Sequence, residues 1–403
     1  MNTPTIRENE YMTLPRFLQI HTLHNYPAAL LNRDDAGLAK RLPYGDKVRT
    51  RISSQCLKRH WRVADDAFAL SRLEVPMAVR SRETPRLIRD RLVAAGVAES
   101  LAQFAVEGLR AAGLVDKAKD LKGKNALETG QAVLLGYAEI DYLVQRCAML
   151  AAEHTEEKAL KTAIAGFLKD EKRNIEAMRL GSGLESALFG RFVTSDVLAG
   201  RDAAVYVAHS FTVHEAQVEN DYFTVVDDLL KDAGETGSAG IFDTELASGL
   251  YYGYVVIDVP QLVANLEGVA IQDWDKATPE QRALAGRVVK HLLHLIATVS
   301  PGAKRGSTAP FAWAKFMLVE AGDWQPRSLA GAFQNALPSN QPTLRKAAVQ
   351  RLVDEIAQMD AAYGAPLSRR YLAVDDVQLP GAERLPLTAL AEWAQSVVTR
   401  AEA

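Results

Sequence analysis

The chain has 403 residues, of which 48% are hydrophobic and 24% are charged, and its formal net charge is −3. This composition excludes collagen-like, mucin-like and wholly disordered chains, because both fractions are close to the globular average. The length is typical of two or three domains, and the two cysteines are too few for a disulfide framework or a zinc cluster. No apolar run is long enough to span a bilayer, and no apolar signal core stands near the start. We therefore expect a cytoplasmic protein without a membrane partner.

The small net charge hides a basic region. Residues 1–62 contain eleven Lys or Arg and five Asp or Glu, a net charge of +6, so the remainder of the chain carries −9. Residues 40–62 alone contain eight basic residues against one acid. A basic patch on an otherwise acidic chain indicates a phosphate-binding surface. The alternative is a solvated basic face that only keeps the protein soluble.

The first predicted elements are a strand at 16–24, rich in branched and aromatic residues, and a long loop that runs from Pro27 to Arg51. A helix is then predicted from Ser53 or Ser54 to about 70, since either serine can cap it. Its apolar residues form one stripe at helical spacing, so its basic residues gather on the opposite side.

From about 84 to 198 the sequence is predicted to be helical almost throughout. The 217–249 segment that separates the next two strands is rich in glycine and acidic residues and less regular. Without these two segments the order is β-α-β-β-α-β, as in ferredoxin-like and RNA-recognition-motif-like domains. The remaining predicted elements are strands at 203–216, 250–259, 314–320 and 369–377, and helices at 279–299, 343–363 and 387–399.

Six sequence blocks support a family resemblance. They are LNRDDAG at 31–37, RTRISSQCLKRHWR at 49–62, ALFGRFVTS at 187–195, DYFTVVDDL at 221–229, FDTELASGLYYGY at 242–254 and SPGAKRGSTAPF at 300–311. In this order and at compatible spacing, from about residue 16 to the C-terminus, they resemble the crRNA-binding backbone subunit of the type I-E Cascade complex, the CasC family of CRISPR interference.

The resemblance implies an α+β fold: a ferredoxin-like, RNA-recognition-motif-like palm with a large helical insertion (fingers) and a thumb insertion. The predicted parts are the first part of the palm at 1–74, the fingers at 75–202, a palm strand at 203–215, the thumb at 216–249, and the second part of the palm with C-terminal helices at 250–403.

The resemblance also implies a non-enzymatic subunit of antiviral defence that needs no cofactor and no metal. Its partners would be crRNA, further copies of itself in a helical stack, other Cascade subunits, and target DNA through the guide. The resemblance further implies that the crRNA backbone would be held by Arg33, Lys40, Gln55, Lys58 and Arg59. It also implies that a displaced base would lie at Phe192, Tyr222, Phe223 and Thr224.

The charge pattern itself extends the RNA-binding set, because Arg and Lys beside a helix N-terminus suit phosphates. The added residues are Lys47, Arg49, Arg51, Arg62, Lys304 and Arg305. The aromatic RNA-recognition consensus is absent from the strands at 203–216 and 250–259, so loops and the basic helix, rather than the sheet face, are expected to bind RNA.

Two other functions stay open. Asp34 and Asp35 could hold a metal beside the phosphate path and cleave guide-paired RNA, although ordering of their loop is the favoured interpretation. A pure protein-interaction scaffold is the third possibility. His21 and His24 are expected on opposite faces of a strand and so without a shared metal, and Cys56 is expected to be a packed thiol.

Overall fold

The computed structural model describes residues 14–113, 127–171, 180–191, 200–226, 238–303, 305–364 and 367–400, so Phe192 and Lys304 lie outside the described residues. The chain divides into two compact units. The first contains residues 1–70, 206–257 and 286–403, and the second contains residues 71–205 and 258–285. No helix in the described ranges is long and apolar enough to cross a membrane.

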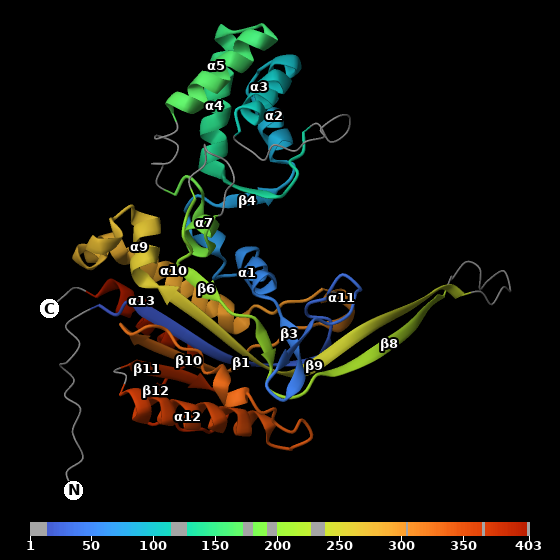
Figure 1. Cartoon of the computed structure of the whole chain (residues 1–403), viewed down its shortest axis with the longest axis vertical. Helices are drawn as coiled ribbons and strands as arrows, with labels where there is room; N and C mark the ends of the chain where they lie inside the picture. The colour runs from blue at the N-terminus through green and yellow to red at the C-terminus, as the bar shows by residue number, and fades with distance from the viewer. Residues whose placement is uncertain are drawn as a thin grey trace. The chain divides into compact units, whose positions relative to one another are not determined.

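The first unit is built on a ten-stranded sheet with the order β12-β11-β10-β1-β9-β7-β3-β2, to which β6 and β8 add by pairing with β9 (Figure 1). Its strands are β1 (Phe17–Ala29), β2 (Arg41–Tyr44), β3 (Lys47–Ile52), β6 (Val205–Val207), β7 (Ser210–Thr212), β8 (Gln217–Val226), β9 (Ser238–Asp258), β10 (Ala314–Gly322), β11 (Ser368–Ala373) and β12 (Glu383–Arg384). Its helices are α1 (Ser54–Arg62), α10 (Pro279–Thr298, which begins in the second unit), α11 (Arg305–Thr308), η4 (Ala330–Phe333), α12 (Leu344–Tyr363) and α13 (Leu387–Thr399).

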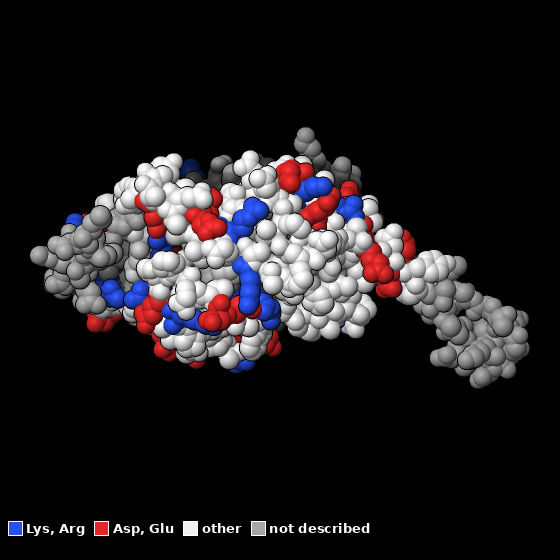
Figure 2. Space-filling view, turned by 90° about the horizontal axis from the view of Figure 1, so that it is seen from below, with Lys and Arg blue, Asp and Glu red and all other residues white. Residues whose placement is uncertain are grey.

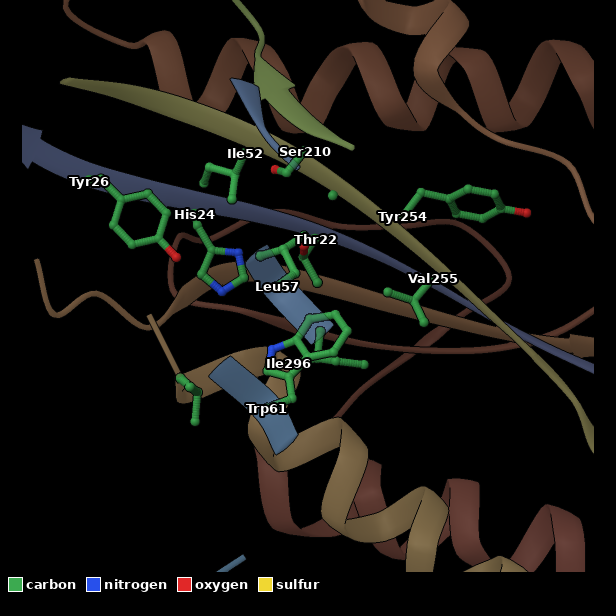
Figure 3. Close-up of a pocket in the computed structure, with 12 residues that line it drawn as sticks. Thr22, His24, Tyr26, Ile52, Leu57, Trp61, Ser210, Tyr254, Val255 and Ile296 are labelled. Atoms are coloured by element: carbon green, nitrogen blue, oxygen red, sulfur yellow. The ribbon is translucent and has the colours of Figure 1, made fainter. Parts of the chain in front are cut away.

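Helices cover both faces of this sheet. On one face, Leu57 and Trp61 of α1 and Ile296 of α10 meet Thr22 and His24 of β1 around a cavity of about 30 Å³ (Figure 3). On the other face, Leu23, Tyr252 and Phe316 belong to the same buried cluster as Leu352 and Ile356 of α12. Within the described residues, helices thus cover both faces of the sheet at strand β1.

His21 and His24 of β1 point to opposite faces, as predicted from the strand period. His21 Nε2 lies 3.2 Å from Glu320 Oε2, and its Nδ1 lies 2.9 Å from the Tyr252 hydroxyl. His24 instead lines the cavity beneath α1 and stacks on Tyr26.

The prediction of a single long loop between Pro27 and Arg51 is wrong, because β2 and β3 form an antiparallel hairpin there. Gly45 and Asp46 make its turn, and Gly45 has a φ of +61°. A Cβ at Gly45 would lie 1.6 Å from the backbone oxygen of Gln334, so this close approach needs glycine.

The 217–249 segment is also more regular than predicted. β8 and β9 pair from Gln217↔Ser248 to Val226↔Ser238 and form a two-stranded ribbon, which extends away from the rest of the first unit (Figure 1). α1 is shorter than predicted and ends at Arg62. Asp66 Oδ1 accepts a hydrogen bond of 2.8 Å from the Phe68 N–H, and this local turn competes with helix continuation.

The second unit has its own hydrophobic core, to which α2, α3, α4 and α5 contribute. The helical run predicted at 84–198 is interrupted by β5, which pairs with β4 in a two-stranded sheet. The elements of this unit are η1 (Leu70–Leu73, which begins at the unit boundary), β4 (Ala78–Ser81), α2 (Thr84–Ala94), α3 (Glu99–Ala111), β5 (Val133–Gly136), α4 (Tyr137–Glu153), α5 (Glu157–Asp170), α7 (Leu184–Phe189), α9 (Val259–Glu267) and η3 (Ile271–Lys276).

Residues 258–285, placed in the palm by the sequence, belong to the second unit. Asn265 of α9 explains this, because its buried side-chain amide donates hydrogen bonds of 2.9 Å to the backbone oxygens of Ala187 and Asp202. Within the same unit, Arg191 pairs with Glu139 at 2.7 Å, and both side chains are buried.

Candidate nucleic-acid interface

Helix α1 presents a polar face to solvent because its apolar face is anchored. Leu57 and Trp61 point toward the cavity over β1 (Figure 3), and Trp61 is buried. Ser53 caps the helix, as its hydroxyl accepts a hydrogen bond from the Cys56 N–H. The opposite side is consequently open. Of the predicted residues, Gln55 and Arg59 are exposed, while Lys58 and Arg62 are partly exposed.

The loop at 30–40 folds against the start of α1. Asn32 Oδ1 accepts a hydrogen bond of 2.9 Å from the Ser53 N–H, and the Lys40 N–H donates to the Asn32 backbone oxygen at 3.0 Å. Asp34 Oδ1 accepts from the Leu38 N–H at 2.9 Å. Asp34 therefore orders the loop. Its neighbours Arg33 and Asp35 are exposed.

A third segment, the loop at 299–313, lies beside the other two. The Ala303 N–H donates to the Leu30 backbone oxygen at 2.8 Å. Ser300 Oγ donates to the Ala312 backbone oxygen at 3.0 Å and accepts from the Ala312 N–H at 2.9 Å. Arg305 begins α11 within this loop and is exposed.

These three segments each contribute a cation whose charge acts on Cys56. Burial raises the pKa of the Cys56 thiol to about 11, against the opposing charges of Lys40, Arg305 and Arg59. We call these three residues the cation cluster. Among the described residues, no acidic side chain forms an ion pair with any of them. Like charges held together without an acid suit a polyanionic ligand.

His209 extends the cation cluster toward the N-terminus of α1. Its Nδ1 atom lies 3.3 Å from both the Ser54 N–H nitrogen and Arg51 Nη1. Burial and the charges of Arg51 and Lys40 lower the pKa of His209. The His209 imidazole therefore links Arg51 to the start of α1.

The other predicted cations have different environments. Lys47 is exposed and pairs with Glu215 at 3.3 Å. Arg49 is wholly buried: it donates to the backbone oxygens of Thr212 at 3.1 Å and Phe333 at 3.0 Å, and lies 3.3 Å from Asp46. A buried guanidinium with these partners holds β3 to its neighbours, so the structure separates Arg49 from the predicted RNA-binding group.

Basic and acidic side chains are mixed on one face of the molecule. On the face shown in Figure 2, basic and acidic side chains are interspersed among broad uncharged areas. Among the described ion pairs, Arg345 pairs with Asp375, and Arg370 pairs with Glu383 at 2.7 Å. The cation cluster differs because its charges are not neutralised by paired acids.

The ribbon carries the predicted thumb residues. Tyr222 is 64% exposed and Phe223 is 38% exposed. They lie opposite Asp243 and Phe242 and, as neighbours on a strand, they face opposite sides of the ribbon. Thr224 follows in β8, opposite Ile241.

Sequence reasoning missed the link between ribbon and loop. Glu245 of β9 is buried, accepts a hydrogen bond of 2.8 Å from the Ala39 N–H, and pairs with Arg41. The Gly-Asp turn, flanked by residues of alternating polarity, was the signal that could have revealed the hairpin containing Arg41. No local signal could have paired Glu245 with it.

The described residues contain no group of three or more His, Cys, Asp or Glu side chains that could hold a metal ion. The arrangement that they do show is a set of cations beside α1, with Arg51 and His209 near its N-terminus and Arg59 in its last turn, which suits phosphate binding.

The chain also resembles known proteins. The family model described as CT1975-like protein matches residues 18–396, so the chain belongs to the CT1975-like protein family. No curated protein sequence matches the chain.

Two solved structures are similar to the chain. A chain of a "CRISPR RNA-guided surveillance complex, pre-nicking" is 28% identical with a TM-score of 0.74, and the match covers 95% of this chain and 100% of that one. A chain of a "CRISPR RNA-guided surveillance complex" is 21% identical with a TM-score of 0.53, and the match covers 94% and 99% of the two chains. The second likeness concerns the fold alone.

Proposed function

We propose that the chain is a non-catalytic, crRNA-binding backbone subunit of a CRISPR RNA-guided complex of the type I-E Cascade kind. The observation that carries the proposal is that hydrogen bonds between three segments bring together the stretches that carry Lys40, Arg59 and Arg305, none of which has an acidic ion-pair partner among the described residues. The similarity to a chain of a CRISPR RNA-guided surveillance complex supports the same function. Several copies would line one guide and hold it for pairing with target DNA.

The fold agrees with the proposed palm. Counting β1, α1, β7, β9, α10 and β10 along the chain gives β-α-β-β-α-β, and the four strands stand in the order β10-β1-β9-β7. We assign this core to the ferredoxin-like, RNA-recognition-motif-like class. The second unit would supply the fingers, and the β8–β9 ribbon the thumb.

Contacts to phosphates suit this function, because they bind every guide sequence equally while base pairing supplies specificity. On the ribbon, Tyr222 on one side and Phe223 on the other would each offer an exposed ring on which a base displaced from the guide can stack.

The proposal is tested by expressing the full chain with a CRISPR array and sequencing the RNA that co-purifies. Wild-type protein is expected to retain guide RNA of every spacer. The variant Lys40→Gln, Arg59→Gln, Arg305→Gln is expected to lose it. A matched control, Arg16→Gln, Arg287→Gln, Lys346→Gln, removes three exposed cations of the first unit and is expected to retain it. Equal RNA content in both variants would contradict the proposal.

The ribonuclease alternative has a direct test of its own. Asp34 is engaged by the Leu38 N–H, which supports an ordering role. Incubation of the assembled complex with complementary RNA and magnesium is therefore expected to leave that RNA intact. Cleavage that disappears in Asp34→Ala or Asp35→Ala would establish the enzyme instead.

A further inference from the structure

The loop at 299–313 exposes two large aromatic side chains. Trp313 is 69% exposed and Phe311 is 68% exposed, which are the highest values among the large hydrophobic residues that the structure describes. Exposed aromatic groups placed close together mark interaction sites more often than single exposed apolar residues do.

The loop holds both aromatics in a fixed position. Ala312, between them, is tied to Ser300 Oγ through both its N–H and its carbonyl oxygen. Ala312 also packs against the small hydrophobic cluster that Cys56 and Leu57 contact. A Cβ at Gly302 would lie 2.6 Å from Pro310 Cγ, so the two sides of the loop are in close contact. The aromatic rings are thus presented to solvent by a tightly packed backbone.

The same loop carries a member of the cation cluster. Arg305 begins α11, and its backbone oxygen accepts a hydrogen bond of 3.0 Å from the Ala309 N–H, two residues before Phe311. Ala312 packs against the same hydrophobic cluster as Cys56 and Leu57 of α1, so Phe311 and Trp313 flank a residue that shares this cluster with the helix carrying Arg59.

Trp313 has further cationic neighbours. It lines a groove of about 630 Å³ together with Lys315 and Arg384. An aromatic ring beside Lys or Arg is the arrangement that single-stranded nucleic acids need, because bases stack on the ring and phosphates pair with the cations.

We propose that Phe311 and Trp313 are a stacking platform for bases of the RNA strand whose phosphates bind the cation cluster. This inference rests on the proposed function and adds a base-contacting surface to it. Stacking on an aromatic ring tolerates any base, so the platform would not restrict the guide sequence.

The test measures the affinity of the full chain for labelled single-stranded RNA by fluorescence anisotropy at several salt concentrations. Phe311→Ala and Trp313→Ala are each expected to weaken binding about tenfold without changing the salt dependence, since no charge is removed. Tyr363→Ala and Trp324→Ala, which remove aromatics that are 65% and 49% exposed, are the matched controls and are expected to bind as wild type.

An abasic strand of equal length separates stacking from charge. It should bind wild type and the Phe311→Ala, Trp313→Ala double variant equally, because no base is present to stack. Wild-type affinity of the double variant for normal RNA would overturn the stacking inference. If that variant bound RNA like wild type but failed to assemble with other copies, the two aromatic residues would form a protein contact instead. The proposed function would survive that result provided that the cation-cluster variant still lost RNA.

Discussion

The Oε1 atom of Glu245, at the base of the β8–β9 ribbon, accepts a hydrogen bond of 2.8 Å from the backbone N–H of Ala39 in the basic loop. Its other carboxylate oxygen pairs with Arg41 of the hairpin. A single buried carboxylate therefore fastens the loop that carries Arg33 and Lys40 to the strand that continues into the ribbon. This carboxylate thus helps to position two predicted RNA-binding residues.

Glu245→Ala is expected to loosen the loop. A hydrogen bond to a charged group contributes about 1.5–3 kcal/mol, so the Ala39 amide should exchange its hydrogen at least about tenfold faster. Glu245→Gln keeps an oxygen acceptor and should have a smaller effect. Hydrogen exchange followed by mass spectrometry measures both. Unchanged protection of Ala39 in Glu245→Ala would show that the loop is held by other contacts.

Arg49→Met is expected to destabilise the fold without affecting RNA binding directly. The substitution leaves the buried backbone oxygens of Thr212 and Phe333 without their donors, which should lower the free energy of unfolding by about 3 kcal/mol. Lys47→Met breaks only an exposed pair with Glu215 and should cost less than about 1 kcal/mol. Urea unfolding compares the two, and equal small losses would contradict the structural role of Arg49.

His24 is expected to contribute to acid sensitivity. Burial lowers its pKa from 6.5 to about 4, so between these values the unfolded chain binds a proton that the folded chain does not. Stability is therefore lost as the pH falls. From pH 7 to pH 5 the loss due to His24 should be about 2 kcal/mol.

The comparison variant is His24→Leu, whose unfolding free energy should fall by about 2 kcal/mol less than that of wild type between pH 7 and pH 5. Urea unfolding at the two pH values provides the measurement. An identical pH-dependent loss in both proteins would mean that His24 is already charged in the folded state.

Much of the fold could be predicted from local patterns. The strand at β1, the helices α10, α12 and α13, and the Ser53 cap follow from period, length and capping chemistry. The β2–β3 hairpin could have been predicted from its Gly-Asp turn between residues of alternating polarity, although Pro43 weakens that signal. Arg49 was placed on the surface because its burial depends on Thr212 and Phe333, both distant in sequence.

The site was predictable only in part for the same reason. The basic ridge of α1 follows from helical spacing, whereas the approach of Arg305 to Arg59 depends on tertiary contacts such as those between Ala303 and Leu30 or between Ser300 and Ala312. The exposure of Phe311 and Trp313 could not be predicted from the sequence, since an aromatic residue in a loop gives no local signal of its exposure.

The salt dependence of RNA affinity tests the central claim most directly. For a single strand, each phosphate contact contributes about 0.7 to the slope of log affinity against log salt concentration. The Lys40→Gln, Arg59→Gln, Arg305→Gln variant should therefore bind single-stranded RNA with a slope about 2 smaller in magnitude than wild type, for every sequence tried. A slope equal to that of wild type would show that RNA phosphates do not bind the cation cluster.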